Sequence, residues 1–192
     1  MKRTLLSIKA ILFSAIAVAC ISACEAQTNT KSEGSTEGSA IHWTSFEEAV
    51  AKSQQSPKKM FIDVYTGWCG WCKKMDASTF TDPEVVKYIN DNFYPVKFNA
   101  ETQDTVHFMD KSFKYLPEYK TNELAISLLA GKLGYPSYVF LDESFTLMGG
   151  AVQGYQAKND MMAYLTYFNA SLHKQQDFES YRKEYFKKNP GQ

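Results

Sequence analysis

Short apolar runs alternate with helical stripes along this chain. A capping box, Ser45-x-x-Glu48, opens a stretch whose apolar residues recur at helical spacing, which predicts a helix over 46–53. The apolar run 60–65, bounded by a proline and a glycine, predicts a strand that is buried on both faces. Its one anomaly is Asp63, a carboxylate inside an otherwise apolar segment.

Similar patterns continue toward the end of the chain. Their order implies an α/β fold with parallel strands and one antiparallel hairpin. The predicted elements are a helix after Cys69, a helix 83–92 capped by Asp82, a strand 93–100, a helix 122–133, strands 135–142 and 145–155 joined as a hairpin, and a closing helix 158–172.

The segment 101–121 is longer than a simple connection. Part of it is expected to form a helix, because four apolar residues share one helical face and a proline follows. These residues are Val106, Met109, Phe113 and Leu116. The segment starts at the sheet edge that carries Cys69, where it either walls a substrate groove or packs on the flank of the domain. Its candidates for substrate contact are Phe108, Tyr115 and Tyr119.

The tail 175–192 carries an aromatic stripe with a basic end. Phe178, Tyr181 and Tyr185 recur at helical spacing, which predicts a further helix. We expect this helix to dock on the domain, and a surface for a partner is the alternative.

Composition is that of a globular protein. Of the 192 residues, 44% are hydrophobic and 15% aromatic, which is enough for one domain with a substantial core. The formal net charge is zero, and without Lys2, Arg3 and Lys9 the remainder carries 18 basic and 21 acidic side chains. No basic surplus is left to attract nucleic acid, so no nucleic-acid partner is expected.

Residues 1–23 have the pattern of an export signal. A basic start precedes an apolar stretch that Lys9 and two serines interrupt. The stretch ends in "ISAC", which resembles a bacterial lipobox and implies cleavage before Cys24 and lipidation of that cysteine. Ordinary signal-peptidase cleavage after Ala26 and a retained membrane helix are the alternatives.

Residues 24–40 contain no aromatic side chain and almost only small or polar ones. They cannot collapse into a core, so we expect a flexible tether. Because Cys20 and Cys24 belong to the leader region, the domain itself contains only Cys69 and Cys72. Two cysteines this close in sequence do not make a structural disulfide framework.

The candidate chemistry lies in "YTGWCGWCKK", residues 65–74. Cys69 follows a buried strand at the start of a helix, where backbone N–H groups and the helix dipole favour a thiolate. Cys72 lies one helical turn later, within reach of a mixed disulfide on Cys69. We therefore predict that Cys69 attacks a substrate and that Cys72 resolves the mixed disulfide, leaving a redox-active disulfide between the two.

Other uses of a CxxC pair fit this chain less well. Zinc needs two further ligands, and His42, His107 and His173 show no ligand spacing. Covalent haem needs a histidine where Lys73 stands. Two inert buried thiols would not need a tryptophan before each cysteine. No metal and no cofactor are expected.

Two separate segments resemble the thioredoxin family. "DVYTGWCGWCKKM", residues 63–75, is similar to the thioredoxin active-site segment, and "GYPSYVFLD", residues 134–142, is similar to the segment that carries a cis-proline before a strand. The similarity spans about 44–172 and is nearest to exported proteins with a WCGWC centre, which resemble the periplasmic C-terminal domains of membrane disulfide reductases. It implies a thioredoxin fold, a central mixed sheet flanked by helices, here with a helical insertion and a C-terminal helical extension.

The resemblance also implies roles for residues outside the cysteine pair. Asp63 matches a buried aspartate that relays a proton to or from Cys72, and burial would raise its pKa. A structural aspartate bonded to the backbone or to Lys58 or Lys59 is the alternative. Pro136 is expected to be cis and to shape a groove for the substrate chain, against the alternative of a plain turn proline.

The expected substrate surface contains five residues: Trp68, Gly70, Trp71, Tyr135 and Pro136. Trp68 would offer an aromatic face to the substrate, with core packing as the alternative. Trp71 stands where typical thioredoxins have proline, so their reducing potential cannot be transferred to this chain.

We therefore expect a thiol:disulfide oxidoreductase of the periplasm or cell envelope that acts on protein or peptide thiols and disulfides. It would draw on an upstream membrane or soluble thiol electron donor and be held at the membrane through Cys24. Reduction is the expected direction, with isomerase or oxidase activity and a non-catalytic binding module or holdase as alternatives. The expected organisation is signal 1–23, tether 24–40, thioredoxin-like domain 41–174 with its insertion at about 101–121, and extension 175–192.

Overall fold

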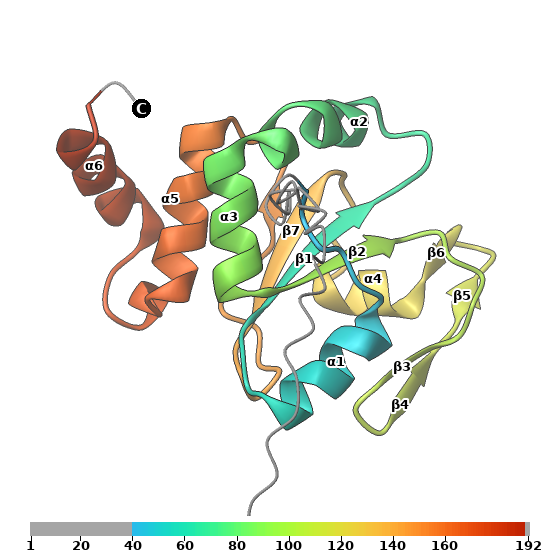
Figure 1. Cartoon of the computed structure of the whole chain (residues 1–192). Helices are drawn as coiled ribbons and strands as arrows, with labels where there is room; N and C mark the ends of the chain where they lie inside the picture. Colours follow the sequence, from blue (N-terminus) through green and yellow to red (C-terminus); the bar gives the residue numbers. More distant parts are fainter. Residues whose placement is uncertain (1–39, 191–192) are drawn as a thin grey trace, which may run out of the picture. The chain divides into compact units, whose positions relative to one another are not determined.

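A four-stranded mixed sheet forms the centre of the protein (Figure 1). The computed structural model describes residues 40–190, so the expected signal segment and Cys24 lie outside the described residues. The sheet order is β2-β1-β7-β8, with β1 parallel to β2 and antiparallel to β7, and β8 antiparallel to β7. Its strands are β1 (Met60–Tyr65), β2 (Tyr94–Asn99), β7 (Ser137–Leu141) and β8 (Val152–Gln153).

Residues 40–190 form six α-helices, and several of their ends follow capping rules. Ser45 caps the first helix by accepting the Glu48 N–H, and Asp82 caps the third, which has Pro83 at its first position. The helices are α1 (Phe46–Gln55), α2 (Gly70–Ala77), α3 (Pro83–Asn92), α4 (Glu123–Leu128), α5 (Lys158–Asn169) and α6 (Phe178–Lys188), with 3-10 turns at Thr79–Thr81 and Leu172–Lys174. The predicted α/β class is confirmed.

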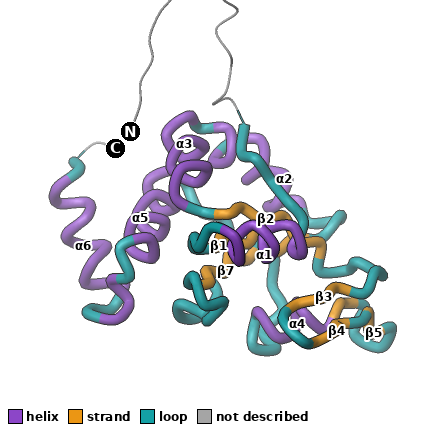
Figure 2. The backbone as a smooth tube through the Cα atoms, turned by 60° about the horizontal axis from the view of Figure 1, so that its bottom comes forward, coloured by secondary structure: helices purple, strands orange, loops and turns teal. Residues whose placement is uncertain are grey.

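The sheet buries both faces, because side chains alternate along each strand. On one face, Phe61 packs in a core with residues of α2, α3 and α5, and α3 and α5 lie side by side (Figure 1, Figure 2). On the other face, Ile62 packs with residues of α1 and α4. The strand β1 is thus buried on both sides, as its sequence predicts, and Asp63 belongs to the face that α2 covers.

The insertion 101–121 contains no helix, so this prediction was wrong. It folds as two small antiparallel pairs: β3 (Val106–Phe108) with β4 (Lys111–Phe113), and β5 (Tyr115–Leu116) with β6 (Thr121–Asn122). Val106 pairs directly with Phe113 across a tight turn in which Met109 takes a left-handed φ of 54°. The apolar spacing that predicted a helical face therefore has another origin, since Val106 and Phe113 are neighbours across two antiparallel strands.

Two further predicted elements are shorter than expected. The helix that begins after Asn122 ends at Leu128, and Ala130 and Gly131 then adopt left-handed conformations that terminate it. The predicted hairpin does form, because Leu141 bridges Leu147 and Tyr138 pairs with Val152. Two consecutive glycines lie between these contacts, and only a two-residue strand follows them.

The C-terminal helix docks on the domain, as predicted. Phe178 stacks on Tyr164 with ring centroids 3.8 Å apart, and the Tyr181 hydroxyl lies 2.8 Å from Thr166 Oγ1. Arg182 donates to Asp160 from two nitrogens. Figure 1 shows α6 alongside α5. Within residues 40–190 no helix is long and apolar enough to cross a membrane.

Candidate active site

Cys69 and Cys72 form a disulfide at the junction of β1 and α2. The sulfur atoms are 2.10 Å apart and the Cα atoms 5.3 Å apart. Cys69 is the N-cap of α2, and its Sγ accepts a hydrogen bond of 3.0 Å from the Cys72 N–H. Both cysteines are 4% exposed, so the bond lies just below the surface. The predicted placement of the pair at a strand-to-helix junction is confirmed.

Two exposed tryptophans flank the disulfide. Trp68 is 68% exposed, donates from Nε1 to Glu101 and lies edge-on to the ring of Tyr135. Trp71 is 56% exposed and lies against the ring of Tyr155, 5.6 Å between centroids. Neither indole belongs to the core, so the core-packing alternative for Trp68 does not hold.

The loop before β7 closes the other side of the site. The Tyr135–Pro136 peptide bond is cis, as predicted. The Pro136 carbonyl accepts the Gly154 N–H at 2.8 Å. The residues that follow Gly154 reach α2, where the Gln156 N–H lies 3.4 Å from Met75 Sδ. Since Tyr135 also contacts Trp68, this loop and the CxxC segment form one continuous surface.

Asp63 lies beneath this surface, 2% exposed. Its Oδ2 is 3.5 Å from Lys97 Nζ, while Lys97 also pairs with Asp76 on α2. Burial raises the pKa of Asp63 to about 7, Lys97 opposes that rise, and the charge of Asp76 adds to it. Asp76 lies one helical turn after Cys72, so it is on the same side of α2 as that cysteine.

The sheet register explains why these groups meet. Asp63 is directly opposite Lys97 on β2 and directly opposite Tyr138 on β7. Tyr138 is fully buried, and burial followed by the charge of Asp63 raises the pKa of its phenol. Within residues 40–190, Asp63 Oδ1, Tyr138 Oη and Thr66 Oγ1 are buried with no hydrogen-bond partner. The site therefore contains three buried polar atoms whose hydrogen-bonding capacity is unused while the disulfide is closed.

Aromatic rings surround the ammonium of Lys97. Its Nζ lies 5.2 Å from the ring centroid of Trp43, 5.3 Å from that of Tyr65 and 6.0 Å from that of Phe80. Such contacts favour a cation that is partly withdrawn from water. The Lys97 side chain thus lies between Asp63 and Asp76, with aromatic rings around its amine.

Sequence reasoning named Lys58 and Lys59 as structural partners for Asp63, and neither contacts it. Lys58 donates to the carbonyls of Asn90 and Asp91, and Lys59 pairs with Glu143. The missed partner was Lys97, whose only signal is its place in the strand "YPVKFN", because its pairing with Asp63 depends on strand register.

The three residues of the insertion that were expected to contact substrate differ in what the structure shows of them. Phe108 is half-buried and packs against Phe46 and Phe145, on the side of the sheet that α1 and α4 cover. Tyr115 and Tyr119 stay predictions. Glu101 contacts Trp68 and Tyr155 contacts Trp71, and the sequence did not indicate either of these contacts.

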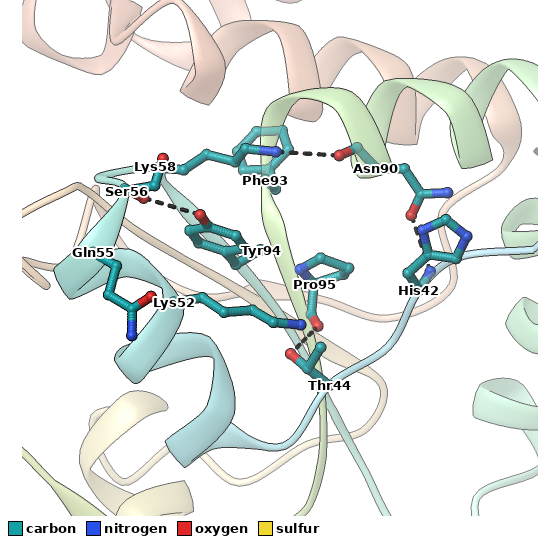
Figure 3. A pocket seen from close by; sticks show the side chains of 10 residues that line it. All are labelled: His42, Thr44, Lys52, Gln55, Ser56, Lys58, Asn90, Phe93, Tyr94 and Pro95. Carbon is teal, nitrogen blue, oxygen red and sulfur yellow. Dashed lines mark hydrogen bonds between the residues drawn. The ribbon is translucent and has the colours of Figure 1, made fainter. Parts of the chain in front are cut away.

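A cavity of about 410 Å³ lies elsewhere, between α1, α3 and the start of β2 (Figure 3). Its cations are already engaged, since Lys58 donates to Asn90 and Lys52 pairs with Glu48. No residue of the cysteine site lines it.

The disulfide at a helix N-terminus, the cis-proline loop beside it and the buried carboxylate on this mixed sheet define a thioredoxin-fold protein with a CxxC centre. The chain belongs to the Thioredox_DsbH family, described as a protein of unknown function, DUF255, whose model matches residues 34–189. The resemblance to the thioredoxin family that the sequence indicated is thereby confirmed.

Curated relatives match parts of the chain. An uncharacterized protein, B0495.5, of Caenorhabditis elegans is 25% identical over 124 residues, which is 64% of this chain and 15% of the relative. The thiol:disulfide interchange protein DsbD of Photorhabdus laumondii subsp. laumondii is 27% identical over 96 residues, 42% of this chain and 16% of the relative. The chain thus spans less than a fifth of the length of either relative.

Solved structures show the same fold. A thioredoxin-fold protein from Helicobacter pylori has a TM-score of 0.53 at 14% identity, covering 68% of this chain and 86% of its own. A thioredoxin from Thermus thermophilus has a TM-score of 0.51 at 19% identity, covering 67% and 87%. A putative disulphide-isomerase from Bacteroides thetaiotaomicron has a TM-score of 0.50 at 22% identity, covering 73% and 96%.

Proposed function

We propose that this protein is a thiol:disulfide oxidoreductase that reduces disulfides of protein substrates in the cell envelope. The observation that carries the proposal is Cys69 as N-cap of α2, with its Sγ accepting the Cys72 N–H. In the reduced state that sulfur would keep a backbone donor and the positive end of the helix dipole, both of which favour a thiolate. The thiolate is the form that attacks disulfides.

The reaction proceeds in two exchanges. The Cys69 thiolate attacks one sulfur of the substrate disulfide, so that a mixed disulfide forms and the other substrate sulfur leaves as a thiolate. The Cys72 thiolate then attacks Cys69 Sγ, releasing the second substrate sulfur and closing the Cys69–Cys72 disulfide. Two electrons pass to the substrate, which becomes a dithiol after taking up two protons. A dithiol donor restores the protein by the same exchanges in reverse.

Asp63 supplies the proton step. A carboxyl group with a pKa of about 7 exchanges a proton readily at neutral pH, and it accepts the proton that Cys72 must lose before it attacks. The cation beside it, Lys97, stabilises the carboxylate that forms in part of the cycle.

The substrate chain would lie across the disulfide between the two tryptophans. Tyr135 precedes β7 and lies outside its pairing with β1, which leaves its peptide groups for an extended substrate. Trp68 and Trp71 supply exposed aromatic faces on either side, and Gly70 between them adds no side chain.

The direction and the location rest on different support. The similarity to a protein named a thiol:disulfide interchange protein favours exchange with other thiol proteins, and the buried carboxyl favours the reductive direction. The leader 1–23 and Cys24 support export and lipid anchoring, with a membrane or soluble dithiol protein as electron donor.

Equilibration with glutathione tests the direction. A Cys69–Cys72 reduction potential close to that of strong oxidants would contradict a reductase. The measurement is sensitive, since about 30 mV in a two-electron couple corresponds to roughly 1.4 kcal/mol. A Cys72→Ala variant should trap substrates as mixed disulfides on Cys69. A Cys69→Ser variant should lose all exchange, and if it still protected unfolded substrates as well as the unchanged protein does, the main function would be that of a holdase.

A further inference from the structure

Lys74 occupies an unusual position beside the disulfide. It lies on the exposed side of α2, and its Nζ is 5.0 Å from the ring centroid of Trp71 and 4.9 Å from that of Tyr155. Among the residues that the structure describes, no carboxylate lies within ion-pair distance of Lys74. An ammonium is therefore fixed between two aromatic rings, and its charge is not balanced by a partner in the same part of the chain.

The ring of Tyr155 is itself held in place. Tyr155 follows Gly154, whose N–H is bonded to the Pro136 carbonyl, and the Tyr155 hydroxyl lies 3.5 Å from Ser78 Oγ. That contact, together with the nearby Lys74 charge, holds the pKa of Tyr155 below its usual value. Trp71 and Lys74 are three residues apart on α2, so they share one face of the helix.

A fixed cation binds an anion at lower entropic cost than a free lysine does, because its side chain is already ordered. The aromatic faces also displace water from the ammonium, which strengthens a pairing with a carboxylate. The nearest competitor on this helix, Asp76, is engaged with Lys97.

The two tryptophans beside the cysteines have neighbours of opposite charge. Trp68 donates to Glu101, so a carboxylate stands beside the first tryptophan while a lysine stands beside the second. A substrate with an acidic residue near its cysteine would be repelled at the Trp68 side and attracted at the Trp71 side. The lysine beside Trp71 is thus the group of this pair that can attract an acidic flanking residue.

We propose that Lys74, Trp71 and Tyr155 form a subsite for an acidic side chain that flanks the reactive cysteine of the substrate. This inference rests on the proposed function, and it names a substrate class for it: proteins whose disulfide lies next to an aspartate or glutamate. Lys73, the adjacent exposed lysine, makes no cation–π contact with any ring of residues 40–190 and takes no part.

The test uses three disulfide peptides that differ only in having Glu, Gln or Lys beside each cysteine. The fully reduced protein is mixed with each peptide, and the rate of peptide reduction is followed over one turnover. We expect the Glu peptide to react about two- to fivefold faster than the Gln peptide, the range of one exposed ion pair, and the Lys peptide to react slowest. Raising the salt to about 1 M should bring the three rates together.

Matched variants identify the residue responsible. Lys74→Gln should abolish the ranking of the three peptides, Lys74→Arg should keep it, and Lys73→Gln should keep it. Equal rates in the unchanged protein, a ranking that survives Lys74→Gln, or one that disappears in Lys73→Gln would each overturn the subsite. Reduction of all three peptides without a ranking leaves the proposed function standing, whereas reduction of none contradicts that function and the subsite with it.

Discussion

Asp63 and Lys97 face each other across β1 and β2, with 3.5 Å between the carboxylate Oδ2 and the ammonium Nζ. The lysine is shared, because Asp76 on α2 pairs with the same ammonium. Burial alone would favour a neutral carboxyl group, and an undivided ion pair would favour an ionised one. The shared lysine leaves the pKa of Asp63 at about 7, between these two outcomes.

The first prediction concerns stability and pH. The pKa of Asp63 is raised from 3.8 to about 7 in the folded state, so folding favours the protonated carboxyl. Its stabilising effect is complete below pH 3.8 and is lost as the pH rises through 7. We compare the free energy of unfolding of oxidised Asp63→Asn with that of the oxidised unchanged protein. This difference should favour the variant by about 2–4 kcal/mol more at pH 8 than at pH 4.

Urea unfolding at the two pH values without reductant measures this difference. Asp91→Asn is the matched control, because Asp91 lies on the exposed side of α3 in a surface pair with Lys87. Its effect should change little between pH 4 and pH 8. Equal effects of Asp63→Asn at both pH values would show that the carboxyl is not buried in the way the structure has it.

Removing the cation should move the pKa of Asp63 upward. Lys97→Met keeps an unbranched chain among the rings of Trp43, Tyr65 and Phe80 but removes the charge that stabilises the carboxylate. The pKa of Asp63 should then lie above 7. The titration of its side-chain carbon in a carbon-13 NMR experiment measures the shift, with Lys87→Met as the surface control. A pKa that falls or stays unchanged contradicts the assignment of Lys97.

Asp76→Asn should have the opposite sign. The charge of Asp76 raises the pKa of Asp63, and its carboxylate also competes for Lys97. With that charge removed, Lys97 pairs with Asp63 alone, and the pKa of Asp63 should fall below 7. The same NMR titration reports it, and in the reduced protein the pH midpoint of substrate reduction should move to lower pH in parallel. An unchanged or higher pKa of Asp63 would contradict this effect of the Asp76 charge.

Local patterns and the family resemblance were enough to predict part of this site. The cysteine pair and the buried Asp63 are visible within a few adjacent residues, the cis-proline loop followed from the resemblance, and the structure places all three as expected. Lys97 is 34 residues from Asp63 and meets it only through strand register, which no local pattern specifies. Tyr155 likewise reaches Trp71 because the Gly154 N–H is bonded to the Pro136 carbonyl.

The insertion shows why the rest of the fold was harder to predict. The spacing from Val106 to Phe113 satisfies one helical face and also a tight antiparallel pair, and the turn at Met109 decides between them. The left-handed φ of Met109 carries no sequence signal, because methionine rarely adopts it.

Asn122 joins this insertion to the domain, and its loss should destabilise the protein. Its side chain is fully buried, accepts the Leu124 N–H as the cap of α4 and donates to the carbonyl of Asp104. Asn122→Ala removes the cap and leaves buried polar groups without partners, which together cost about 2–4 kcal/mol. Ser45→Ala, which removes the exposed cap of α1, should cost only about 1 kcal/mol. Urea unfolding of the two variants compares them directly, and a loss for Asn122→Ala no larger than that for Ser45→Ala would mean that the insertion does not depend on this residue for its attachment.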